Sequence, residues 1–147
     1  MTLAERLNED LKLAMKSQDK FKLSVLRMVR AAIKNQEIER KRSLDDSEVI
    51  DVLSREIKQR RDSLQDFEKA GRTDLAEQVT AEIEIISAYL PKPLTEEEVT
   101  ALVQQTIQET GASSKADMGK VMAALMPKVK GRADGKLVNR IVSQQLN

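Results

Sequence analysis

Apolar residues recur at intervals of three and four positions along almost the whole chain, a spacing that predicts amphipathic helices. Thr2 and Glu5 form a capping box at the start of the first helix, whose apolar stripe runs from Leu3 to Met15. A second helix is predicted to end in the charged run Arg40–Arg42. Its inner stripe consists of Phe21, Val25, Met28, Val29, Ala32 and Ile33. No segment shows the sustained alternation of a strand, so the pattern predicts an all-α fold.

Two further helices are marked by their start and stop signals. Asp45 as N-cap and Glu48 at the third helical position begin one of them, and Gly71 is expected to end it as a C-terminal cap. Thr73 is placed to cap the next helix. Pro91 ends that helix, because a proline ring disfavours helical geometry at the preceding residue.

The segment from Pro91 to Pro93 is the clearest domain boundary, because two prolines give a stiff, extended link. We therefore expect an N-terminal helical subdomain over residues 1–90 and a small three-helix C-terminal subdomain over residues 94–147. The second has only about fifty residues, close to the size at which a lone core becomes marginal.

Three helices are predicted after this boundary. Thr95 and Glu98 repeat the capping-box pattern, and Gly111 stops the helix that they begin. The next helix is expected to end at Pro127, and the last to begin at Asp134.

Composition excludes several kinds of chemistry. The chain has no cysteine and no histidine, so disulfides, thiolate nucleophiles, zinc–sulfur sites and Ser-His-Asp triads are impossible. We predict no catalytic residue, no cofactor and no metal site. Phe21, Phe67 and Tyr89 are the only aromatic residues, too few for a base-stacking platform. A nucleic-acid partner is therefore expected to be a folded one, read through phosphates and shape.

No apolar run approaches membrane length, and the start of the chain, Met1–Arg6, turns amphipathic at once. These features predict no signal peptide, no membrane partner and a cytoplasmic location.

The net charge of +1 hides a strong segregation of charge. Lys12–Arg42 holds ten basic and three acidic residues, and Asp62–Glu109 holds three basic and eleven acidic ones. Lys115–Asn147 holds seven basic and two acidic residues. For the first run we favour the interpretation that it is an ordinary solvated helix face.

The last basic region is the candidate binding surface. It places cations beside Gly131 and Gly135, which suit left-handed backbone or close approach. An open, positively charged backbone favours an anion such as phosphate. The predicted nucleic-acid-binding residues are Lys128, Lys130, Arg132 and Lys136, helped by Lys120 and Arg140 on the flanking helices.

Two stretches of the chain resemble the GatB/YqeY domain family, and the resemblance is to a free-standing member of that family. Gly119–Lys136 reads G-K-V-M-A-A-L-M-P-K-V-K-G-R-A-D-G-K, and Tyr89–Glu98 reads Y-L-P-K-P-L-T-E-E-E. Domains of this family form the tail of the B subunit of the glutamine-dependent tRNA amidotransferase and are appended to some glutaminyl-tRNA synthetases. The resemblance implies a non-catalytic accessory module that holds tRNA or another structured RNA. It also implies the amidotransferase or an aminoacyl-tRNA synthetase as a partner.

Two other functions stay open. The family resemblance suggests a part in a carbon–nitrogen ligase with glutamine as amide donor, although the chain has no P-loop and no G-x-S-x-G elbow. Alternatively, the acidic stretch Asp62–Glu109 is an interaction surface for a basic protein partner.

Overall fold

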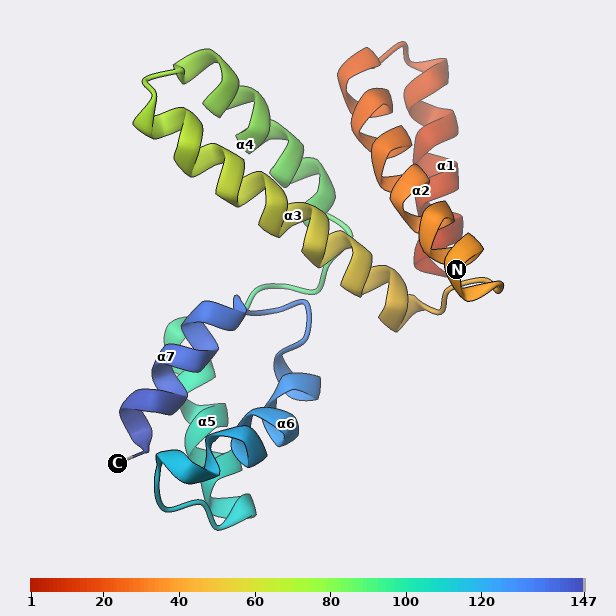
Figure 1. Cartoon of the computed structure of the whole chain (residues 1–147). Helices are drawn as coiled ribbons and strands as arrows, with labels where there is room; N and C mark the ends of the chain where they lie inside the picture. Colours follow the sequence, from red (N-terminus) through yellow and green to blue (C-terminus); the bar gives the residue numbers. More distant parts are fainter. Residues whose placement is uncertain (147) are drawn as a thin grey trace. The chain divides into compact units, whose positions relative to one another are not determined.

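The computed structural model describes residues 1–146, which form helices and no strand (Figure 1). The prediction of an all-α fold is confirmed. The α-helices are α1 (Leu3–Lys16), α2 (Lys20–Arg40), α3 (Asp46–Lys69), α4 (Thr73–Ser87), α5 (Glu96–Thr110), α6 (Met118–Val129) and α7 (Gly135–Gln145). A short 3₁₀ turn, η1 (Lys115–Asp117), precedes α6. Contacts group the chain into two compact units, Met1–Leu90 and Pro91–Asn147.

The N-terminal unit consists of two helical hairpins, α1–α2 and α3–α4 (Figure 1). Its core draws on α3 only as far as Ile57 and on α4 only near its end. The buried residues of this core are Leu7, Leu11, Val25, Leu26, Val29, Ile33, Val49, Val52, Leu53, Ile57, Ile86 and Tyr89. Residues 60–84, the remainder of α3 and most of α4, form a two-helix arm, from which Ile83 packs against this core.

The helix signals read from the sequence are largely confirmed. Capping boxes begin α1 at Thr2 and α3 at Asp45, each with a glutamate three residues on. Gly71, at φ +70°, follows the last turn of α3, where its N–H and that of the next residue bond carbonyls of that turn. Thr73 does not cap α4. It is the first residue of the helix, and the preceding residue, Arg72, supplies no side-chain cap.

The predicted inner stripes of α1 and α2 are partly wrong. Met15, Phe21 and Met28 are 52%, 40% and 41% exposed, whereas Ala14 and Leu26 are buried. The helical period shows which face of a helix is apolar, but it does not fix which residues at the edge of that face are buried. Contact with α3 and α4 then decides which edge of the stripe is covered.

The junction end of the N-terminal unit is fixed by Tyr89. This side chain is 5% exposed, and its hydroxyl donates a hydrogen bond to the carboxylate of Asp10 in α1. The guanidinium of Arg6 lies 4.7 Å from the centre of the Tyr89 ring and donates to the carbonyl of Ala88 at 3.2 Å. The residues just before Pro91 are thus held on α1.

In the C-terminal unit, α5, α6 and α7 pack on one another. The buried residues of their core are Val99, Val103, Val121, Leu125, Val129, Val138, Ile141, Val142 and Leu146. The predicted capping box at Thr95, the stop at Gly111 and the cap at Asp134 are confirmed.

The prediction that Pro127 ends α6 is wrong. The helix runs on to Val129, with Pro127 inside its last turn. Near a helix end a proline removes only one backbone hydrogen bond. Val129 is 1% exposed, and its burial holds the last turn against the core.

Candidate nucleic-acid interface

The six predicted cations are distributed over two helices and the turn between them. Lys120 and Lys128 lie on α6, Lys130 is its C-cap, and Arg132 lies in the turn. Lys136 and Arg140 lie on α7. The predicted loop is therefore much shorter than the sequence suggested, because α6 extends past Pro127.

Lys128 is held against α5. Its ammonium group donates to the Glu109 carboxylate at 2.9 Å and to the hydroxyl of Thr106 at 3.2 Å. Thr106 is fully buried, and its hydroxyl donates in turn to the carbonyl of Leu102 at 2.7 Å. The bond from Lys128 and its charge hold the pKa of Glu109 below its usual range. Lys128 thus joins α6 to α5 as well as contributing positive charge.

Arg140 makes a second contact of this kind. Its guanidinium lies 2.8 Å from the carboxylate of Glu96, and both side chains are more than half exposed. Glu96 begins α5 and Glu109 lies near its end. The two ion pairs are therefore close to opposite ends of one helix.

Arg132 fixes the start of the C-terminal unit. Its Nε donates to the carbonyl of Lys92 at 3.1 Å, and its own carbonyl accepts from the N–H of Leu94 at 2.7 Å. Gly131, at φ +71°, provides the left-handed residue that the turn requires. Gly135 has no such role, since it is the first residue of α7 and a Cβ there would meet no atom within 4 Å.

Lys120 and Lys136 are exposed, whereas Lys130 is half-buried and takes part in a polar interaction. Lys120 lies near Asp117, whose pKa is lowered mainly by the N–H of Ser113, with a smaller contribution from Lys120. Among the cations of the C-terminal unit, Lys128 and Arg140 are thus paired with carboxylates of α5, whereas Lys120 and Lys136 are exposed without such a partner among residues 1–146. Arg132 belongs to neither group, since it bonds the carbonyl of Lys92.

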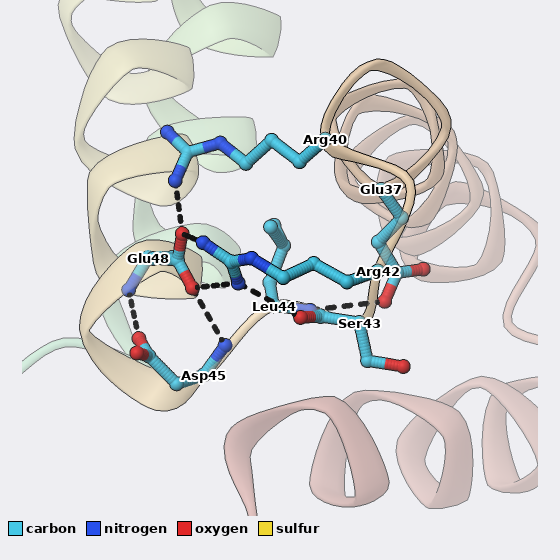
Figure 2. A network of polar contacts seen from close by, with 7 residues as sticks. All are labelled: Glu37, Arg40, Arg42, Ser43, Leu44, Asp45 and Glu48. Carbon is cyan, nitrogen blue, oxygen red and sulfur yellow. Dashed lines mark hydrogen bonds and ion pairs between the residues drawn. The ribbon is translucent and has the colours of Figure 1, made fainter.

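The basic run of the N-terminal unit is partly neutralised at the α2–α3 corner (Figure 2). The carboxylate of Glu48 accepts a hydrogen bond from Arg40 and two from Arg42, the latter at 2.7 Å. It also accepts from the N–H of Asp45 at 3.1 Å, which completes the capping box. These donors, Arg42 first, lower the pKa of Glu48 to about 2. This network stabilises the corner, and sequence reasoning had assigned only Asp45 and Glu48 to it.

The acidic stretch Asp62–Glu109 is divided between the two units. In the N-terminal unit it covers the α3–α4 arm, where an open hollow is lined by three carboxylates, Glu68, Glu77 and Glu84. The other residues that line the hollow are small or apolar, namely Leu64, Gly71, Thr73, Ala76, Thr80 and Ala81.

Within residues 1–146, no group of three or more carboxylates is placed to hold a metal ion. None of the helices in the same range combines the length and the apolar character needed to cross a membrane.

These features define a small helical protein with a basic three-helix C-terminal unit. The chain belongs to the YqeY family, since the model of Yqey-like proteins matches residues 4–146.

The chain is similar to proteins named "Altered inheritance of mitochondria protein 41, mitochondrial". The protein of Pyrenophora tritici-repentis is 31% identical over 142 residues, which cover 95% of this chain and 78% of that protein. The Lachancea thermotolerans protein is 38% identical, with 74% of this chain and 59% of its own length covered. The Kluyveromyces lactis protein is 39% identical, with 70% and 57% covered. The chain thus spans less than two thirds of the last two proteins.

The prediction of a cytoplasmic location is wrong, because these relatives are named as mitochondrial proteins. The prediction relied on the absence of long apolar runs and on the amphipathic stretch Met1–Arg6. Neither property distinguishes the cytoplasm from another aqueous compartment.

Proposed function

We propose that the C-terminal unit binds a structured RNA, tRNA in the first place, by contacting phosphates, and that it acts as an accessory module without catalysis of its own. The observation that carries the proposal is the excess of seven basic over two acidic residues in Lys115–Asn147. The chain's aromatic residues, Phe21, Phe67 and Tyr89, belong to the N-terminal unit. The C-terminal unit therefore has cations but no ring on which a base could stack.

The ion pairs of Lys128 and Arg140 are compatible with this role. The side chains of Lys128 and Glu109 are 33% and 52% exposed, and those of Arg140 and Glu96 are 55% and 64% exposed. Exposed ion pairs contribute at most about 1 kcal/mol, so a phosphate can replace the carboxylate without preventing binding. Lys120 and Lys136 need no such exchange with the carboxylates of α5.

The family resemblance supports the choice of RNA and partner. The stretches Tyr89–Glu98 and Gly119–Lys136 resemble domains attached to a tRNA amidotransferase and to glutaminyl-tRNA synthetases. We therefore propose tRNA as the ligand and such an enzyme as the protein partner. On this proposal the isolated chain releases no ammonia from glutamine, and release that is lost on substituting one of its own residues would contradict the non-catalytic role.

The test is binding of purified protein to total tRNA as the salt concentration is varied. Replacing Lys120, Lys136 and Arg140 together by Ala should weaken binding mainly at low salt. It should also flatten the log–log salt slope by roughly two to three units, since each lost phosphate contact removes about 0.7–0.9. A folded variant with unchanged affinity and slope would refute the proposal.

A matched control removes three exposed cations from the N-terminal unit. Lys20, Arg27 and Lys34 lie on α2 and are exposed. Replacing them by Ala changes the net charge by the same amount and should leave the slope close to that of the wild type. An equal loss from both variants would indicate a general charge effect rather than a surface on the C-terminal unit.

The hollow on the α3–α4 arm favours a second function, binding of a basic helical segment from a protein partner. Glu68, Glu77 and Glu84 line this hollow together with small or apolar residues, a composition that suits the apolar side of a helix flanked by Lys or Arg. Replacing these three glutamates by Gln should abolish capture of such a partner and leave tRNA binding intact. Loss of tRNA binding in that variant would contradict the division of the two functions.

A further inference from the structure

We propose that Glu96 and Glu109 set the affinity of the C-terminal unit for RNA, because they compete with phosphates for Arg140 and Lys128. This inference rests on the RNA-binding function proposed above. It adds that two acidic residues of α5 limit the strength of binding.

The geometry of the two ion pairs carries the inference. Each joins a carboxylate of α5 to a cation from another helix, at 2.9 Å for Lys128 with Glu109 and 2.8 Å for Arg140 with Glu96. A carboxylate and a phosphate present the same kind of charged oxygen to a cation. The carboxylate therefore occupies a donor and offsets part of the charge that its cation could otherwise give to a phosphate.

Glu109 stays charged when this exchange occurs. An ordinary glutamate pKa of 4.5 already leaves Glu109 ionised at neutral pH, and Lys128 lowers the pKa of Glu109 further while the two are paired. Once Lys128 has turned to a phosphate, the carboxylate keeps, among the residues that the structure describes, only the neutral amide of Gln105 as a partner, at 3.1 Å, and its uncompensated charge repels the phosphate. The exchange thus costs the ion pair and adds a repulsion.

This cost favours ligands with many phosphates over ligands with one. A single phosphate group that displaces one carboxylate gains little, since it replaces one ion pair by another. A folded RNA contacts several cations at once, including the exposed Lys120 and Lys136. These additional phosphate contacts offset the free-energy cost of exchanging both carboxylates.

The two pairs are independent of each other. Glu96 and Glu109 are thirteen positions apart in α5, which corresponds to about 20 Å along the helix at ~1.5 Å per residue. Effects of substitutions at such a separation are expected to add in free energy and to multiply in affinity.

The test replaces each carboxylate by its neutral amide and measures binding to total tRNA. Glu109→Gln and Glu96→Gln should each tighten binding by roughly two- to fivefold at low salt, and the double variant by roughly four- to twenty-fivefold. The gain should shrink as salt is added, because added ions screen the carboxylates. Thermal stability should stay the same or fall slightly, so a gain in affinity could not be attributed to a more stable fold. A merely structural role would not raise affinity.

Glu97→Gln is the matched control. Glu97 is exposed, lies next to Glu96 in α5 and forms no ion pair with the residues that the structure describes. Its substitution changes the net charge by the same unit, so it measures the general effect of charge. The inference predicts a smaller gain for Glu97→Gln than for either of the other variants.

Two results would overturn the inference, and they differ from each other. Suppose that the wild type binds tRNA with a steep salt slope and that Glu96→Gln and Glu109→Gln change the affinity no more than Glu97→Gln does. Glu96 and Glu109 then do not compete with phosphate, whereas the RNA-binding proposal stands. If neither the wild type nor any variant binds tRNA, the RNA-binding proposal fails and this inference fails with it.

Discussion

The hydroxyl of Tyr89 donates a hydrogen bond to the carboxylate of Asp10, seventy-nine positions earlier in the chain. Tyr89 is almost fully buried, and it lies two residues before Pro91. This bond connects the end of the N-terminal unit to α1. It is thus a tertiary contact that determines where the connection to the C-terminal unit begins.

Tyr89→Phe should lower the free energy of unfolding of the N-terminal unit by about 1–2 kcal/mol, because a hydrogen bond to a charged, part-buried acceptor is lost. The ring and its contact with Arg6 are kept. Denaturant titration followed by circular dichroism measures the change. A variant as stable as the wild type would show that water replaces Tyr89 as the partner of Asp10.

The same tyrosine provides a spectroscopic test at alkaline pH. Burial, and then the bond to Asp10, raise the pKa of Tyr89 above its ordinary value of 10.0. Because the pKa is raised in the folded state, the protonated Tyr89 hydroxyl contributes its full stability below pH 10.0. This contribution is lost as pH rises towards the folded-state pKa. Tyr89 is the only tyrosine and the chain has no tryptophan, so tyrosinate absorbance reports this group alone. Asp10→Asn should bring ionisation to lower pH, and an unchanged titration would contradict the assigned cause.

The lowered pKa of Glu48 predicts that the N-terminal unit loses stability in acid. The pKa of Glu48 falls from 4.5 to about 2 because Arg42, and then the N–H of Asp45, bind the ionised form. The depressed value means that the contribution to stability is complete above pH 4.5 and is lost as pH falls from there towards about 2.

Glu48→Gln should therefore be less stable than the wild type at neutral pH, and its stability should depend less on pH inside this window. Denaturant titrations on both sides of the window measure the difference. Glu39→Gln, at an exposed site on α2, is the control. Parallel pH profiles for wild type and Glu48→Gln would refute the role of the corner network.

Features that depend on a few neighbouring residues were predictable from the sequence. The capping boxes at Thr2, Asp45 and Thr95 each need only a cap residue and a glutamate three positions on. The same holds for Gly71 and Gly111, whose left-handed backbone ends a helix.

Features that depend on distant partners were not predictable. Lys128 meets Glu109 nineteen positions earlier, and Arg140 meets Glu96 forty-four positions earlier. No spacing rule relates such pairs before the helices are packed. Sequence reasoning therefore grouped Lys128 and Arg140 with the exposed Lys136 and missed the acidic residues that hold them.

Two glycines of the C-terminal unit should respond to alanine with opposite signs. Gly111 has φ +68°, so Gly111→Ala should destabilise the unit by about 1–2 kcal/mol even though a Cβ would meet no atom within 4 Å. Gly119 lies in α6 with equal space around it, and Gly119→Ala should stabilise by about 0.4–1 kcal/mol. Thermal unfolding compares the two, and destabilisation of similar size at both sites would contradict the backbone argument.

Lys128 and Lys136 should separate stability from binding. Lys128→Ala removes the cation paired with Glu109 and the donor to the Thr106 hydroxyl, so the thermal midpoint should fall by about 2–5 °C. Lys136 is exposed, and Lys136→Ala should leave the midpoint unchanged.

In tRNA binding, Lys136→Ala should have the larger effect of the two substitutions. The charge of Lys128 is already offset by Glu109, whereas that of Lys136 is not offset in this way. When Glu109→Gln is introduced first, Lys128→Ala should weaken binding as much as Lys136→Ala does. If Lys128→Ala reduces the affinity for tRNA by the same factor with and without Glu109→Gln, the Glu109 carboxylate does not weaken the interaction of Lys128 with RNA.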